Sequence, residues 1–99
     1  MDFVDVFNVS ENVLRPSQQP VTILVEYGRY PGPYSLVIFN SAGEHIKTLE
    51  DLTNLSRPVS QTYQWDGKNK YGDTCASGVY ILDLVEPYDR KERKLLIVR

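Results

Sequence analysis

The sequence predicts an all-β domain, folded as a sandwich of about seven short antiparallel strands. Apolar and polar residues alternate with a period of two in several segments, turn-forming residues separate these segments, and no segment shows a helical period. The 99 residues fit a single domain, 1–99, which is long enough to bury one core without disulfides or metal.

The first predicted strands lie in the amino-terminal half. Residues 4–9 form a short candidate, and ENVLRPSQQP after it is interpreted as a bend. In residues 21–27 every second side chain is apolar or aromatic, which predicts a strand with one face in the core. Gly and Pro residues between 28 and 33 interrupt the pairing. Residues 34–40 are apolar on both faces, as expected of a central strand.

An irregular strand follows a turn. Gly43 in NSAGE is available for a positive φ, which predicts a turn there. In residues 44–50 the inward Ile46 and Leu49 are three apart rather than two. A bulged or edge strand produces that spacing, and a helical turn would produce it too. The segment LTNLSRP is interpreted as an irregular connection.

The last strand signals occur in the carboxyl-terminal half. Residues 59–65 alternate strictly and place Trp65 on the inward face. In residues 78–86, Asp83 marks the face expected to be wet. The residues expected on the opposite, core face are Tyr80, Leu82 and Leu84. EPYDRKE then turns the chain, and residues 93–99 form the closing strand.

The dense stretch WDGKNKYGDTCASGVY, residues 65–80, is assigned a structural role. Trp65 is expected to plug one end of the core, because a buried indole covers a large area. Asp66 follows a strand and is expected to accept backbone N–H groups two residues on. Gly67 and Gly72 supply positions where a residue without Cβ turns at low cost.

The rest of that stretch is also explained by folding. Its tip is expected to be solvated and consists of Lys68, Asn69 and Lys70. Gly78 begins the next strand, in which Tyr80 is expected to lie near Trp65. No residue is left that requires a catalytic explanation.

These residues also carry a resemblance. Trp65-Asp66-Gly67, the polar loop with Gly72, and Ser77-Gly78-Val79-Tyr80 closely resemble the immunoglobulin-like domain of flagellar hook-capping proteins, called FlgD-like. The segments LRPSQQPVTILVEY, YSLVIFNSAGEHIKTL and RKLLIVR look like the same family's earlier and closing strands. The match covers roughly residues 12–99. The chain is also similar to carboxyl-terminal sorting domains of the type IX secretion route.

The resemblance implies an immunoglobulin-like or fibronectin type III-like sandwich without an active site. It implies a non-catalytic accessory module that spaces, docks or sorts a larger exported bacterial protein, outside the cytoplasm or at the cell surface. Expected partners are domains of the parent chain or other proteins, and the isolated domain is expected to be a monomer. Lys68, Asn69 and Lys70 stand where the family is often acidic, and Cys75 where an aliphatic residue or Pro is usual. Both departures weaken any ion-binding role.

Charge and hydropathy argue against two classes of partner. Eleven basic and thirteen acidic residues give a net charge of −2, and the basic cluster is interrupted by Glu92. That cluster consists of Arg90, Lys91, Arg93 and Lys94. A solvated hairpin of mixed charge is therefore expected, and nucleic acid is not an expected partner. The sequence holds no apolar run of roughly 20 residues, and its first ten residues do not resemble a signal peptide.

Metal and catalytic chemistry are not expected. A calcium loop in DGKNKYGD would need oxygen ligands where Lys68 and Lys70 stand. His45, the single histidine, lies near no nucleophile elbow and is interpreted as a solvent-facing strand residue. Cys75 has no disulfide partner, and one His with one Cys cannot complete a structural zinc site. Cys75 is interpreted as a semi-buried loop residue, with lysine-activated thiol chemistry as the alternative. No cofactor or metal is predicted.

One stretch remains as a candidate contact surface. In EYGRYPGPY, Arg29, Tyr30 and Tyr34 surround a proline turn, and exposed tyrosines beside an arginine are typical of protein and sugar contacts. The competing interpretation makes Tyr27 and Tyr34 core residues and leaves only Tyr30 exposed. The alternative function is therefore a fibronectin type III-like or carbohydrate- or protein-binding module that uses this loop.

Overall fold

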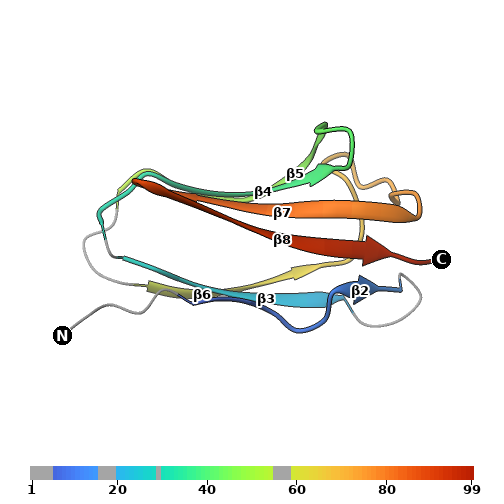
Figure 1. Ribbon diagram of the computed structural model, residues 1–99, viewed down its shortest axis with the longest axis horizontal. Helices are drawn as coiled ribbons and strands as arrows, with labels where there is room; N and C mark the ends of the chain where they lie inside the picture. Colours follow the sequence, from blue (N-terminus) through green and yellow to red (C-terminus); the bar gives the residue numbers. More distant parts are fainter. Residues whose placement is uncertain (1–5, 16–19, 29, 55–58) are drawn as a thin grey trace.

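The computed structural model describes residues 6–15, 20–28, 30–54 and 59–99. Its strands are β1 (Phe7–Val9), β2 (Val13–Leu14), β3 (Val21–Tyr27), β4 (Tyr34–Asn40), β5 (His45–Leu52), β6 (Val59–Trp65), β7 (Gly78–Glu86) and β8 (Asp89–Ile97). A three-stranded sheet, in the order β1-β3-β6, stacks on a five-stranded sheet, in the order β2-β8-β7-β4-β5 (Figure 1). The predicted all-β sandwich is confirmed, and its architecture is consistent with an immunoglobulin-like fold.

Alternation located most of the strands correctly. β3, β4, β6 and β7 have the bounds that the pattern of apolar residues predicts. β5 is an edge strand with two register shifts against β4, so the bulged edge strand is confirmed and the helical turn is wrong. Within the first candidate, Phe7–Val9 forms β1, and residues 4 and 5 of that candidate lie outside the described part of the chain.

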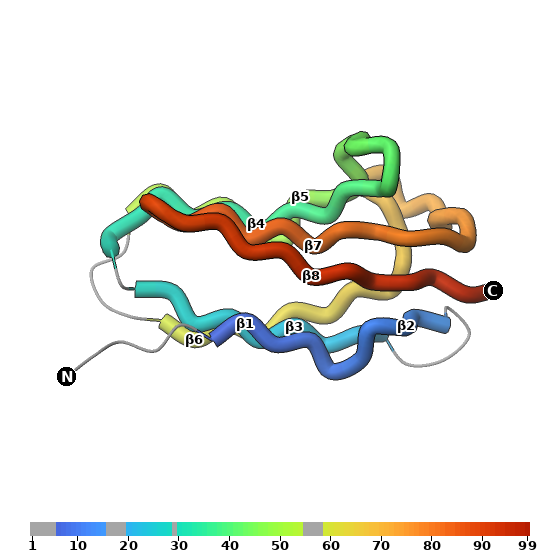
Figure 2. Tube along the Cα trace, in the orientation of Figure 1, coloured from blue at the N-terminus to red at the C-terminus, as the bar shows by residue number. Residues whose placement is uncertain are grey.

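One strand was not predicted. The segment interpreted as a bend contains β2, which pairs in parallel with β8 through Val13 opposite Leu96 and Leu14 opposite Ile97. The blue amino-terminal segment thus contributes β1 to one sheet and β2 to the other (Figure 2). Two residues are too short for an alternation signal, and the expectation of antiparallel pairs alone is wrong here.

The last strand begins earlier than predicted. Glu86 pairs with Asp89, so the turn contains only Pro87 and Tyr88 instead of the whole EPYDRKE segment. β8 therefore starts at Asp89 and carries the basic cluster. The first half of β8 pairs with β7 but exposes mostly polar side chains. It therefore shows no alternation of apolar residues from which a strand could be predicted.

The core lies between the sheets and is made by alternate strand residues. Its buried apolar members are Phe7, Leu14, Val21, Ile23, Val25, Tyr27, Tyr34, Leu36, Ile38, Trp65, Cys75, Tyr80, Leu82, Leu84, Leu95 and Ile97. Ile46 and Leu49 pack against this core from β5 and are only partly buried. The predicted core face of β7 is confirmed.

Asp83 is a correction to the predicted wet face. Its exposed fraction is only 3%, although it lies on the face of β7 opposite the core. Arg90 covers it: Nε donates to Oδ1 at 2.9 Å and Nη2 donates to Oδ2 at 2.7 Å. Both carboxylate oxygens therefore have a partner, which is the condition under which a charge is buried at low cost.

Two other basic residues of the cluster, Lys91 and Arg93, also have contacts with neighbouring residues. Arg93 lies over the ring of Phe7, with its guanidinium carbon 4.8 Å from the ring centre. Because Phe7 belongs to β1 and Arg93 to β8, this contact closes one open side of the sandwich. Lys91 pairs with Glu86, with Nζ 3.6 Å from Oε1.

The tryptophan stretch connects the two sheets, since β6 belongs to one and β7 to the other. Trp65 is fully buried, and its Nε1 donates to the carbonyl of Lys68 at 2.9 Å. Its ring meets the ring of Tyr80 edge to face, with centroids 5.7 Å apart. Asp66 Oδ1 accepts the Lys68 N–H at 3.1 Å. Gly67 has a φ of +82°, and a Cβ there would lie 3.0 Å from Leu14 Cδ2.

The tip of this connection is more ordered than expected. Lys68 and Lys70 are exposed, but Asn69 is half-buried and its Oδ1 accepts the N–H groups of Tyr71 and Asp73. The Lys70 N–H also donates to the carbonyl of Ile46 at 2.8 Å, which ties the loop to β5. The prediction of a solvated tip is wrong for Asn69, because its side-chain amide is half-buried and its oxygen bonds two backbone N–H groups of the turn.

A chain of hydroxyl groups spans the other open side, between β5 and β6. The hydroxyls of Tyr27 and Tyr63 lie 3.0 Å apart, and Tyr63 donates to Glu50 Oε1 at 2.8 Å. Burial raises the pKa of Tyr27 from 10.0 to about 12, against the lowering effect of its hydrogen bond with Tyr63. Burial and the hydrogen bonds to Tyr27 and Glu50 likewise raise the pKa of Tyr63.

Replacing Trp65 with Ala is expected to lower the free energy of unfolding by about 3–5 kcal/mol, the usual cost of deleting a large core aromatic side chain. Urea unfolding followed by circular dichroism measures this loss. Tyr71→Ala is the matched control, since Tyr71 lies in the same loop and its exposed fraction is 77%. A loss below about 1 kcal/mol for Trp65→Ala would contradict the buried position.

Stability is expected to fall in alkali. The folded pKa of Tyr27 is raised, so its contribution is complete below the unfolded value of 10.0 and is lost as the pH rises toward about 12. Tyr27→Phe should flatten this fall in urea unfolding between pH values of about 10 and 12. Tyr71→Phe should leave it unchanged, and an equal flattening by both variants would refute the assignment.

Candidate functional site

The strongest candidate for a contact surface is a pair of tyrosines at one end of the sandwich. Tyr30 belongs to the connection between β3 and β4, and Tyr88 to the turn between β7 and β8. Their rings meet edge to face, with centroids 5.2 Å apart and planes at 75°. The exposed fractions are 38% for Tyr30 and 91% for Tyr88, so the pair presents apolar ring surface to the solvent.

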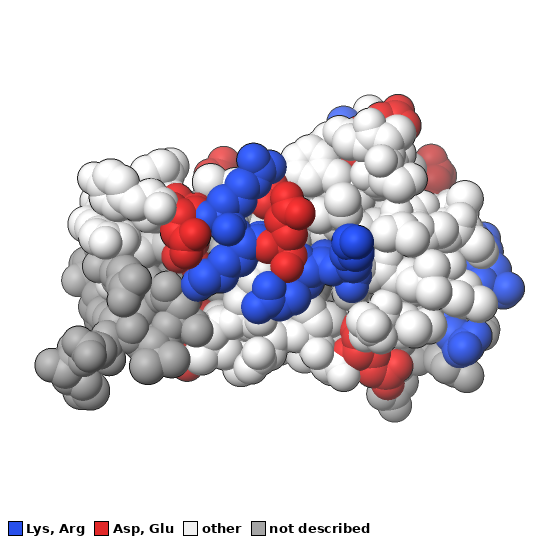
Figure 3. Space-filling model, viewed as in Figure 1, with Lys and Arg blue, Asp and Glu red and all other residues white. Residues whose placement is uncertain are grey.

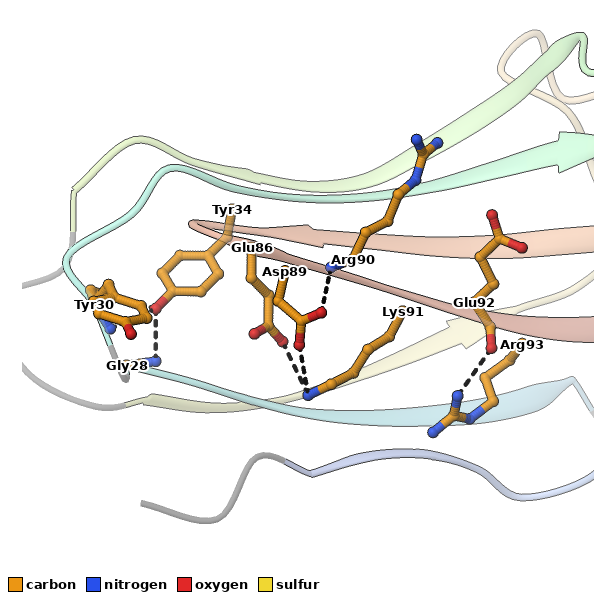
Figure 4. A network of polar contacts seen from close by, with 9 residues as sticks. All are labelled: Gly28, Tyr30, Tyr34, Glu86, Asp89, Arg90, Lys91, Glu92 and Arg93. Carbon is orange, nitrogen blue, oxygen red and sulfur yellow. Dashed lines mark hydrogen bonds and ion pairs between the residues drawn. The ribbon is translucent and has the colours of Figure 1, made fainter. Parts of the chain in front are cut away.

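Tyr34 does not belong to this surface, which corrects the predicted set. It is buried, its ring meets that of Tyr27 edge to face, and its hydroxyl accepts the N–H groups of Gly28 and Tyr30 at 3.2 and 3.0 Å (Figure 4). The same hydroxyl donates to the carbonyl of Tyr30. Tyr34 therefore fixes the backbone from which Tyr30 projects. Arg29 lies outside the described residues.

The backbone of Tyr88 is strained. Its φ is +67°, in the left-handed region that Gly and Asn occupy more readily than an aromatic residue. Pro87 before it suits the second position of a tight turn, and the third position of such a turn often has a positive φ. A non-glycine residue in this region costs on the order of 1–3 kcal/mol, and such residues concentrate at functional sites.

Charged groups hold the base of this turn. Lys91 Nζ lies 3.6 Å from Glu86 Oε1 and 4.0 Å from Asp89 Oδ2, and Asp89 Oδ1 accepts the N–H of Arg90 (Figure 4). Glu86 has an exposed fraction of only 8%. On the face that carries β8, Lys and Arg alternate with Asp and Glu rather than forming a patch of one sign (Figure 3).

His45 and Cys75 both interact with other residues of the fold. His45 is exposed, and its Nε2 lies 2.8 Å from Thr48 Oγ1. Cys75 is buried, and burial raises the pKa of its thiol despite a hydrogen bond with Tyr80 that lowers it. This direction is opposite to the one that an activated thiol needs.

A shallow depression of about 250 Å³ lies on the outer face of the five-stranded sheet. Its lining includes Phe39, Asn40, Ile81, Asp83, Arg90 and Glu92. Both carboxylate oxygens of Asp83 accept hydrogen bonds from Arg90, and Asn40 Oδ1 accepts the N–H groups of Ala42 and Glu44. Since these polar atoms serve the fold, the depression is a weaker candidate than the tyrosine pair.

Across the described ranges, no three His, Cys, Asp or Glu side chains gather closely enough to hold a metal ion. The same part of the chain contains no helix with the length and hydropathy needed to span a bilayer.

Sequence reasoning found Tyr30 and missed Tyr88. The missed signal was the Pro87-Tyr88 pair, which suits a two-residue turn once the charged residues after it are assigned to a strand. The contact between the two tyrosines joins connections that are far apart in the sequence, so only the assembled sandwich reveals it.

No family model matches the chain, and no curated protein matches it. Among solved structures, the chain is similar to PorZ, described as an essential bacterial surface component of the type IX secretion system of Porphyromonas gingivalis. The two share 24% identity with a TM-score of 0.63, over 94% of this chain and 11% of PorZ. At this identity the likeness shows the fold. The chain thus shares its fold with a segment that makes up 11% of PorZ.

Proposed function

We propose that the chain is a non-catalytic accessory domain of a larger exported bacterial protein, which it spaces, docks or sorts at the cell surface. The observation that carries this proposal is the match to PorZ, in which nearly the whole of this chain corresponds to a small fraction of a surface component. The FlgD-like resemblance around Trp65 and Gly78 supports the same role, because such domains serve as assembly and attachment modules.

A binding role is the second candidate, and the tyrosine pair favours it. Tyr88 is held at a strained φ and projects its ring into solvent, where a glycine would relieve the strain. Aromatic side chains presented from rigid turns are typical anchors for proteins and sugars. The mixed charges at the base of the turn suit an uncharged or mixed-charge partner better than a polyanion.

The sorting role predicts surface delivery of a cargo. A reporter with a signal peptide, fused ahead of this chain, should reach the cell surface in a bacterium with a working type IX route. The same reporter without the chain should stay in the periplasm, and so should the fusion in a strain that lacks the route. Equal periplasmic retention of all three would exclude sorting and leave spacing or docking.

Hydrolytic turnover by the purified chain that His45→Ala abolishes would refute the non-catalytic assignment.

The binding role predicts that Tyr88→Gly separates stability from binding. This variant should raise the free energy of unfolding by about 1 kcal/mol, because it relieves the left-handed strain. It should also weaken any ligand found on a glycan array or in a pull-down by at least about tenfold, the loss of one aromatic anchor. Tyr71→Gly is the control, since it removes an exposed ring at the opposite end of the molecule. Unchanged affinity in Tyr88→Gly would exclude this surface.

A further inference from the structure

Strand β6 forms an open edge of the three-stranded sheet. It pairs with β3 along all seven residues without a register shift, and no other described strand pairs with its second side. A regular edge strand offers unpaired N–H and C=O groups to any strand that approaches it.

The register identifies which backbone groups face outward. Thr22 O accepts from Ser10 N, and Glu26 N donates to Val6 O, so the even-numbered residues of β3 bond toward β1. The odd-numbered residues of β3 therefore bond toward β6. Thr22 pairs with Gln64, so the even-numbered residues of β6 direct their backbone groups to the open side. These exposed residues are Ser60, Thr62 and Gln64.

The other sheet edges have the usual protection against pairing, and β6 has none. β1 and β2 contain only three and two residues. β2 pairs only with Leu96 and Ile97 of β8, and the part of β8 before them, with the sequence DRKERKL, is mostly charged. β5 has two register shifts and carries Lys47, Glu50 and Asp51. β6, with the sequence VSQTYQW, has no charged residue, no Pro and no bulge. Short length, charges and bulges are the features that keep edge strands from pairing with one another.

We propose that β6 is a homodimerisation edge, at which two copies pair antiparallel about a two-fold axis through Thr62. Thr62 then lies opposite Thr62 of the second copy, and Ser60 lies opposite Gln64. Each of these pairs has its N–H and C=O groups directed to the interface, so each exchanges two hydrogen bonds. The two three-stranded sheets become one continuous sheet. This departs from the monomer expected from the sequence.

A second copy fits this edge better than other occupants because the edge is complementary to itself. In the two-fold register no charged side chain of β6 faces another, and the outer face presents Thr–Thr and Ser–Gln pairs. The net charge of −2 adds little repulsion between copies. A single strand edge buries less than the roughly 800 Å² per partner of a standard interface, so the dimer should be weak, with a Kd of micromolar or higher.

Sedimentation velocity of the purified chain over a range of concentrations tests the proposal. The wild-type chain should shift from monomer to dimer between about 10 μM and 1 mM. Thr62→Lys places two like charges at the axis and should raise the Kd at least about tenfold with no loss of circular dichroism. Thr48→Lys is the matched control, because it makes the same change on the exposed face of edge strand β5 and should dimerise like wild type.

A crosslink gives an independent readout. Residues that form a hydrogen-bonded antiparallel pair have Cα atoms about 5.5 Å apart, which a disulfide can bridge. Thr62→Cys should form a covalent dimer with oxidised glutathione, two thiols being oxidised while one glutathione disulfide is reduced. The wild type, whose single thiol at Cys75 is buried, should not.

A wild-type monomer at every concentration would overturn the proposal, and so would dimerisation that Thr62→Lys leaves unchanged. Open-ended aggregation in place of a dimer would overturn it too. None of these results bears on the proposed accessory role, which rests on the PorZ match rather than on β6.

Discussion

The burial of Trp65 is the constraint on which the rest of the structure depends. Trp65 ends a strand of the three-stranded sheet, and its ring packs against Tyr80 near the start of a strand of the five-stranded sheet. The hydrogen bond from its indole to Lys68 removes the cost of burying an N–H group. Because the chain changes sheets between these two aromatic residues, the same contact sets the spacing of the layers and the path of the loop.

The two ends of the sandwich consequently differ in character. At the Trp65 end, the amide of Asn69 and the carboxylate of Asp66 are used to hold backbone N–H groups. At the other end, Tyr34 holds the connection while Tyr30 and Tyr88 remain at the surface. At the Trp65 end, the polar side chains therefore stabilise the turn. At the other end, the backbone holds two aromatic rings at the surface, and that end is therefore the candidate for contacts.

The long sides of the sandwich are closed by polar groups rather than by apolar packing. Arg93 lies over Phe7 on one side, and Tyr63 reaches Glu50 on the other. These contacts seal the core between strands of different sheets and leave the backbone edge of β6 open beside them. Within the described residues, side chains close the core at these sides, but the outward backbone groups of β6 have no partner strand.

The sequence by itself determined the fold class, four of the strands and the core face of β7, because a period of two directly encodes which side of a strand is buried. It also determined the burial of Trp65 and the turn at Asp66, which depend on local chemistry. Only the tertiary structure decided the rest. The β2–β8 pairing, the burial of Asp83 under Arg90 and the contact of Tyr30 with Tyr88 each join distant residues whose own segments carry no sign of the partner. Such contacts form only when the sheets stack, so their physical cause is absent from any local pattern.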